Sequence, residues 1–154
     1  MARITASVLT AIVLGGCATT PSTPQEKILG KWSCSMEMSG LKGSANLTYV
    51  ADGTSSGPIS FTGEAEGIEV DIAGNVDATW AFGADGKLRE TITDFEIETA
   101  SFDGEKMNEA MIAGVIEPML ADTITGGESI ADVTFEGNTM TLAAEGADPT
   151  VCSR

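Results

Sequence analysis

The sequence predicts a mainly β protein, a small antiparallel β-barrel or sandwich of about eight or nine strands with one amphipathic α-helix. Most segments carry apolar residues at every second position, which is the periodicity of a half-buried strand. Turn-forming pairs such as Asp85-Gly86 and Gly137-Asn138 recur at hairpin spacing. Only residues 104–121 change to helical spacing.

The first two strands follow from simple alternation. Trp32, Cys34 and Met36 share one face of the first strand, with serine and glutamate residues between them. A second strand is expected over residues 44–51. Glycine, proline and serine then predict a loop over residues 52–58.

The middle of the chain predicts long strands joined by tight turns. Apolar and acidic residues alternate over residues 68–72, and Gly74-Asn75 is expected to turn the chain before a strand over residues 76–82. Residues 87–99 are extended, but their apolar positions change from even to odd. A β-bulge near Thr93-Asp94 would reconcile the two halves.

The expected helix covers residues 104–121. Asp103 is its expected N-cap, and Ile112 and Ile116 widen an apolar face whose members recur at helical spacing: Met107, Ala110, Met111, Gly114 and Val115. After it, Ile130 to Phe135, Thr139 to Ala144 and a short segment at residues 150–153 complete the strands; the last of these carries Cys152.

The N-terminus resembles the signal peptide and lipobox of bacterial lipoproteins. Arg3 precedes a short apolar run, which is too short to span a bilayer, and Leu14-Gly15-Gly16-Cys17 ends it. The resemblance implies cleavage of residues 1–16 and lipid attachment at Cys17, so that the mature chain is held on a membrane by its acyl chains. Ala18, in place of aspartate, implies the outer membrane of a Gram-negative bacterium.

The expected organisation is therefore a signal peptide, a lipidated tether and one domain. Residues 17–26 are polar and contain two prolines, so we expect a flexible spacer. Residues 27–154 have the length of a single domain.

The charge of the chain excludes some partners. Its formal net charge is −15, with 23 acidic and 8 basic residues, and loss of Arg3 makes the mature form more negative by one. Such a chain is not expected to bind nucleic acid or to adsorb directly to anionic lipid. The acidity fits either general solubility in the cell envelope or a basic partner.

The remaining cysteines, Cys34 and Cys152, are expected to form a disulfide, because an even pair in an exported protein usually does. It would join the first strand to the last. Metal binding is the weaker alternative, since the chain has no histidine to complete a zinc site.

The sequence gives no sign of an enzyme or a cofactor. Without histidine there is no Ser-His-Asp triad, and no nucleotide-binding glycine motif is present. Asp94, Glu96 and Glu98 alternate along one strand and are the candidates for glycoside hydrolysis; calcium could be held by the same run or by Asp71, Asn75 and Asp77. The run is read as the solvated face opposite Phe95 and Ile97.

Gly30-Lys31-Trp32 resembles the opening motif of lipocalin-like (calycin) barrels. The resemblance implies that Trp32 plugs one end of a barrel and packs against a basic residue near the end of the chain, here Arg154. A barrel of this kind has a possible ligand cavity. The residues considered for lining it, or alternatively for filling the core, are Trp32, Met36, Trp80 and Phe82.

Two functions are expected from these features. The first is a membrane-anchored envelope lipoprotein whose lipocalin-like domain binds a small apolar ligand. The alternative is an acidic lipoprotein that interacts with or inhibits a basic protein, or that has a structural role in the envelope.

Overall fold

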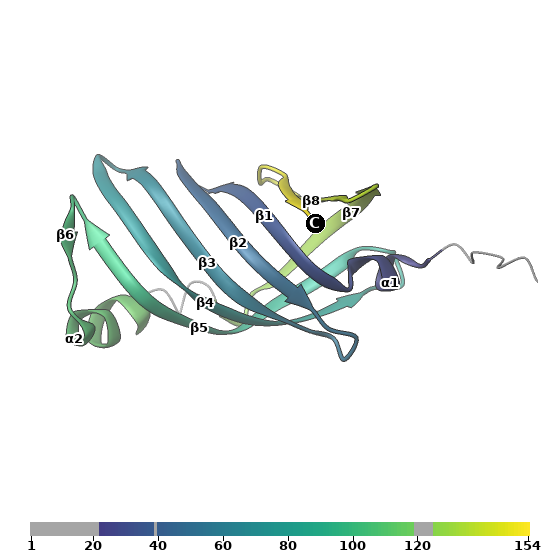
Figure 1. Ribbon diagram of the computed structural model, residues 1–154, viewed down its shortest axis with the longest axis horizontal. Helices are drawn as coiled ribbons and strands as arrows, with labels where there is room; N and C mark the ends of the chain where they lie inside the picture. Colours follow the sequence, from purple (N-terminus) through teal and green to yellow (C-terminus); the bar gives the residue numbers. More distant parts are fainter. Residues whose placement is uncertain (1–21, 39, 119–124) are drawn as a thin grey trace, which may run out of the picture.

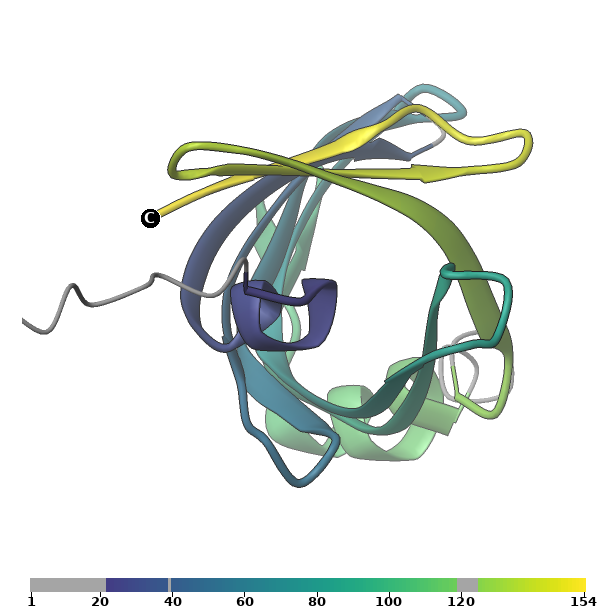
Figure 2. The same ribbon diagram turned by 90° about the vertical axis from the view of Figure 1, so that its right-hand side faces the viewer.

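The strands of the protein form a closed ring in a computed structural model, which describes residues 22–38, 40–118 and 125–154. Each strand pairs with antiparallel neighbours, and the pairings β1–β9 and β4–β5 close the sheet on itself. Figure 1 shows the ring from the side and Figure 2 from one end. The expected β-rich fold is thus confirmed as a barrel, not an open sandwich.

The elements in chain order are a short helix, five strands, a small strand with a helical segment, and three final strands. Their bounds are α1 Pro24–Ile28, β1 Gly30–Met38, β2 Leu41–Tyr49, β3 Thr54–Ala65, β4 Ile68–Phe82, β5 Leu88–Phe102, β6 Glu105–Lys106, α2 Glu109–Met111, the π-helix η1 Ile112–Ile116, β7 Glu128–Glu136, β8 Thr139–Ala144 and β9 Thr150–Ser153. β6 pairs only with the end of β5 and lies outside the ring.

The alternation of apolar residues accounts for the inner face of the barrel. The even positions of β4 from Val70 to Trp80 are buried, and most of the odd positions are exposed or half-buried. β5 keeps its apolar side inward only by means of the expected bulge: Asp77 pairs with Asp94 and Ala78 with Ile92, so Thr93 is the extra residue. A second bulge at Glu98, between Ile97 and Thr99, returns the pattern to even positions.

One expected turn is wrong, and one expected loop is too long. Gly74-Asn75 lies inside the continuous strand β4, and the chain turns instead at Glu66-Gly67, between Ala65 and Ile68. Residues 54–58, assigned to a loop, begin β3. Gly74 is required for a different reason: a Cβ there would lie 2.1 Å from the carbonyl oxygen of Glu96.

The helix expected over residues 104–121 begins later, at Glu109, and residues 119–121 of the expected helix lie outside the described residues. Asp103 and Gly104 form the two-residue turn between β5 and β6, both with positive φ, so Asp103 is not the N-cap. Asn108 caps the helix by accepting a hydrogen bond from the amide of Met111 at 2.9 Å. The expected apolar face is confirmed only in part. Ile112 and Ile116 are buried against β4 and β5, whereas four other residues of this face are exposed: Ala110, Met111, Gly114 and Val115.

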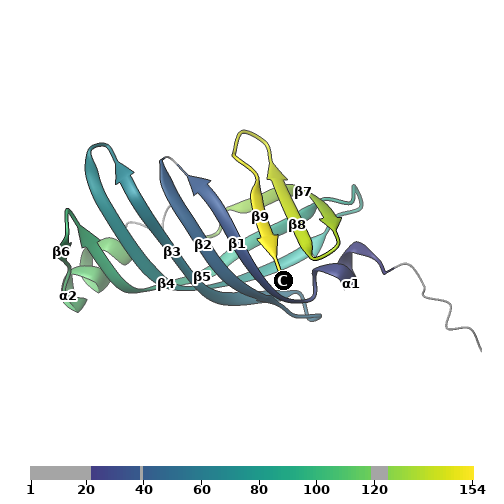
Figure 3. The ribbon, with the colours of Figure 1, turned by 45° about the horizontal axis from the view of Figure 1, so that its top comes forward.

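The interior has two apolar clusters at opposite ends of the barrel. One lies beside α1 and holds Ile28, Trp32, Trp80, Leu88, Met140 and the two cysteines. The other lies beside η1 and holds Val70, Ile72, Phe95 and Ile97. Figures 1 and 3 show α1 and α2 at these two ends. No helix of the described residues is long and apolar enough to cross a membrane.

Candidate functional site

The end of the barrel beside α1 is filled by aromatic and aliphatic side chains. Trp32 is 1% exposed, and its indole Nε1 donates a hydrogen bond to the Ile28 carbonyl oxygen at 2.7 Å. The guanidinium of Arg154 lies 4.3 Å from the centre of the Trp32 ring and donates to the Leu29 carbonyl oxygen at 3.0 Å. Figure 2 shows α1 lying across this end. These contacts join the N-terminal and C-terminal segments of the domain and close this end of the barrel.

Beyond this plug the barrel contains a cavity of about 460 Å³. This volume lies within the range of small-molecule sites. Its wall is mainly apolar and is built from the inward positions of the ring strands. Representative lining residues are Met36, Leu47, Ile59, Val76, Ile92 and Leu142.

The cavity reaches the end of the ring that lies away from α1. Ala147 and Asp148 of the β8–β9 loop, Gly127 before β7, and Glu37 near the end of β1 all border it. Figure 3 shows the β8–β9 loop at the opposite end of these strands from the C-terminus. A ligand would therefore enter from the end opposite the Trp32 plug.

A hydrogen-bonded pair stands inside this apolar wall. The hydroxyl of Tyr49, on β2, donates to Oε1 of Glu90, on β5, at 2.9 Å. Tyr49 is 2% exposed, and its ring makes an edge contact with that of Trp80 at 5.9 Å. Glu90 lies between the inward-facing Leu88 and Ile92, so its side chain points into the barrel.

The surroundings of Glu90 disfavour its charge. Desolvation by burial raises the pKa of this carboxyl, and the hydrogen bond from Tyr49 only partly opposes the shift. Burial likewise raises the pKa of the Tyr49 hydroxyl, with the charge of Glu90 and their hydrogen bond as further causes. In the described part of the chain, no Lys or Arg lines the cavity.

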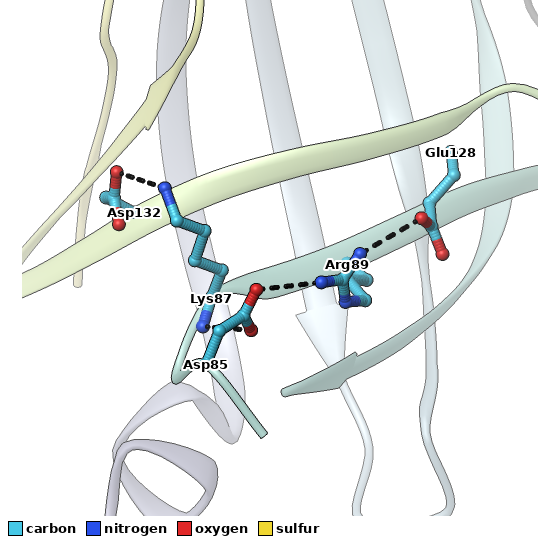
Figure 4. A network of polar contacts seen from close by, with 5 residues as sticks. All are labelled: Asp85, Lys87, Arg89, Glu128 and Asp132. Carbon is cyan, nitrogen blue, oxygen red and sulfur yellow. Dashed lines mark hydrogen bonds and ion pairs between the residues drawn. The ribbon is translucent and has the colours of Figure 1, made fainter. Parts of the chain in front are cut away.

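The cations nearest in sequence to Glu90 lie on the outside of the barrel. Lys87 pairs with Asp132 at 2.9 Å, and Arg89 pairs with Asp85 at 2.8 Å and with Glu128 at 3.2 Å. Figure 4 shows the contacts with Asp132 and Glu128 reaching from the start of β5 to β7, and Asp85 beside Arg89. The side chain of Glu128 is thereby held by Arg89, although the residue borders the cavity.

The four residues proposed from the sequence to line a cavity or fill a core divide between these roles. Met36 lines the cavity. Trp32 and Trp80 belong to the buried cluster beside α1, and Phe82 packs against that cluster. Sequence reasoning missed Glu90 as a site residue, although a signal existed: its even position between Leu88 and Ile92 places a carboxylate on the apolar side of a strand.

The expected disulfide is present. Cys34 and Cys152 are directly opposite one another in the β1–β9 ladder and are bonded. Cys34 borders the cavity, and Cys152 is fully buried in the cluster beside α1. The bond therefore closes the ring covalently between its first and last strands. Cys17, the expected lipid attachment site, lies outside the described residues.

The carboxylate run of β5 lies on the outer face. Asp94, Glu96 and Glu98 are exposed, and Glu98 accepts a hydrogen bond from Asn75 at 2.8 Å. Within residues 22–38, 40–118 and 125–154, no group of three or more Cys, Asp or Glu residues is placed to hold a metal ion.

Comparison with models of known protein families finds none that matches this chain, and a search of curated protein sequences finds no match either.

Proposed function

We propose that this protein is a membrane-anchored envelope lipoprotein whose barrel binds a small apolar ligand. The observation that carries the proposal is the apolar cavity of about 460 Å³ behind the Trp32 plug. An eight-stranded barrel has an interior that is either filled by side chains or able to hold one small ligand, and an apolar cavity of this size favours the second case.

Two further features support the proposal. Arg154 over Trp32 reproduces the contact that the Gly30-Lys31-Trp32 motif implies for a lipocalin-like barrel. The lipobox-like sequence ending at Cys17 supports a lipid anchor. Because Thr23 and α1 lie at the plugged end, the tether would join the barrel at the end opposite the cavity mouth.

Ligand binding is tested by native mass spectrometry of residues 18–154, exported to the periplasm without the lipid anchor. We expect a reproducible non-covalent adduct, and the displaceable uptake of N-phenyl-1-naphthylamine as an apolar fluorescent probe. Ala78 lines the cavity and Ala81, on the same strand, is exposed. Ala78→Phe should abolish both signals, and Ala81→Phe should leave them unchanged.

Protein that carries no adduct and takes up no probe would contradict the ligand-binding proposal and favour interaction with a basic protein. Anchoring is tested separately with Cys17→Ser in the full chain. The variant should lose labelling by radioactive palmitate and leave the membrane fraction. Unchanged labelling would contradict the lipoprotein assignment without bearing on the cavity.

A further inference from the structure

Glu90 is the carboxyl group that lies among the inward-facing apolar side chains of the cavity; the other acidic residues at its border are exposed: Glu37, Glu128 and Asp148. Tyr49 donates to Oε1 of Glu90, and no described residue makes a hydrogen bond or ion pair with Oε2. Glu90 is half-buried, and it borders the cavity. Oε2 is not among the buried atoms, so it is open to the cavity, where a ligand with a hydrogen-bond donor could pair with it.

A second polar group lies next to this pair. Ser55 is 3% exposed, stands opposite Tyr49 in the β2–β3 ladder and borders the cavity. Its hydroxyl makes no hydrogen bond to another described side chain. The inner part of the cavity therefore presents oxygen atoms, which can accept hydrogen bonds, from two neighbouring positions.

The polar groups lie at the inner end of the cavity, beside the Trp32 plug, and the apolar wall lies between them and the mouth. Glu90 adjoins Leu88 and pairs with Trp80, both of which belong to the plug cluster. Ile59, Val76 and Ile92 contact or belong to the cluster on the η1 side. A ligand that satisfies both regions would enter with its polar head first and leave its apolar part toward the mouth.

The charge of the site decides which kind of head would fit. The described lining has no cation to balance Glu90 or to receive an anionic head, and the chain as a whole carries a formal net charge of −15. Both features repel a carboxylate or phosphate and attract a cation. An ammonium group supplies three donors and a positive charge, which match the free carboxylate oxygen and the Ser55 hydroxyl.

We infer that the cavity is selective for apolar amines, whose ammonium head binds Glu90 at the inner end while the hydrocarbon part lies along the apolar wall. This inference rests on the proposed ligand-binding function and adds the chemical class of the ligand. Tyr49 is the positioning residue, because its hydroxyl fixes one oxygen of Glu90 and leaves the other directed to the ligand.

The test uses three probes with the same hydrocarbon chain: n-decylamine, n-decanol and n-decanoate, each below its micelle concentration. Affinities for residues 18–154 are measured by isothermal titration calorimetry and by native mass spectrometry. We expect n-decylamine to bind at least about tenfold more tightly than n-decanol, and n-decanoate to bind more weakly than either.

The variant Glu90→Gln should remove the preference for the amine while leaving n-decanol binding nearly unchanged. Glu96→Gln is the matched control, because Glu96 is exposed on the same strand and loses the same charge. It should retain the amine preference. Circular dichroism and a thermal melt establish that both variants are folded.

The possible results separate this inference from the proposed function. Binding of n-decanol with no amine preference, or an equal loss in Glu90→Gln and Glu96→Gln, overturns the amine selectivity and leaves the ligand-binding barrel standing. Preference for n-decanoate also overturns it. Failure of all three probes to bind would contradict both proposals.

Discussion

Reduction of the Cys34–Cys152 disulfide removes the only covalent link between the first and last strands of the described barrel. The two residues face each other across β1 and β9, which are joined by just three residue pairs. The neighbouring β1–β2 ladder has nine pairs. The β1–β9 contact is therefore a short seam in the ring, and the disulfide lies at its centre.

The magnitude follows from the length of chain that the bond encloses. The two cysteines are 118 residues apart in sequence, so nearly the whole domain lies within the loop. In the chain-entropy model, a cross-link of this span lowers the entropy of the unfolded chain enough to stabilise the fold by about 4–5 kcal/mol. Measured effects are often smaller, so we expect reduction to cost about 3–5 kcal/mol.

The free energy of unfolding can be measured by guanidinium titration and fluorescence, since Trp32 and Trp80 are both buried. Oxidised and reduced wild-type protein differ only in the cross-link. The double variant Cys34→Ala with Cys152→Ala also removes two buried sulfur atoms and should lose about 1 kcal/mol or more beyond reduction. A loss below about 1 kcal/mol on reduction would refute the argument that the disulfide holds the seam.

Three further changes test other parts of the fold. Because burial raises the pKa of Glu90 above 4.5, the folded state keeps the carboxyl proton to a higher pH than the unfolded chain does. The free energy of unfolding should therefore fall as the pH rises from about 4.5 through the folded pKa. Glu90→Gln should flatten this slope in urea titrations at a series of pH values. Arg154→Ala removes the contact with Trp32 and should cost about 1–2 kcal/mol by denaturation, whereas an unchanged midpoint would show that the plug does not need it. Gly74→Ala should cost about 1–3 kcal/mol because its Cβ meets backbone, whereas Gly114→Ala meets nothing within 4 Å and should change thermal stability by less than about 1 kcal/mol. Equal effects of the two glycine substitutions would contradict the close approach in β4.

Local patterns in the sequence were sufficient to predict the β-rich class, several of the barrel strands and their inner faces. The alternation in β1 and β4, the bulge at Thr93 and the Cys34–Cys152 pair are all visible in the sequence and all present in the structure. Each depends on side-chain periodicity or on a pairwise chemical rule. Such signals do not depend on knowing the three-dimensional neighbours.

The predictions of turns and caps were wrong where the role of a residue depends on a contact with a residue distant in sequence. Gly74 was interpreted as a turn, but its lack of a side chain permits the carbonyl of Glu96 to approach, which only the β4–β5 register reveals. Asp103 was interpreted as a helix cap, but it forms a hairpin turn with Gly104. Glycine is common both in turns and in strands where another backbone approaches closely, and aspartate is common both in turns and at helix caps. The pairing of the strands determines which role each residue has.

The cavity depends on small side chains at several inward positions of the barrel. At the plugged end, the inward positions hold bulky residues, which meet in the centre and exclude solvent: Trp32, Trp80, Leu88 and Met140. Farther along, several of the lining positions are small: Ala45, Ser55, Ala78, Ala131 and Ala144. An eight-stranded ring is just wide enough for large side chains to fill it, so small ones leave space.

The small lining residues also leave room for a carboxylate at Glu90. A large apolar neighbour in place of Ala78 or Ala131 would fill the space that the Glu90 side chain faces and leave the carboxyl without room for a partner. The small residues and the inward glutamate are therefore two parts of one site. Ala131→Phe should consequently lower stability more in wild-type protein than in a Glu90→Leu background, because only the wild type then buries a carboxyl with one oxygen unpaired.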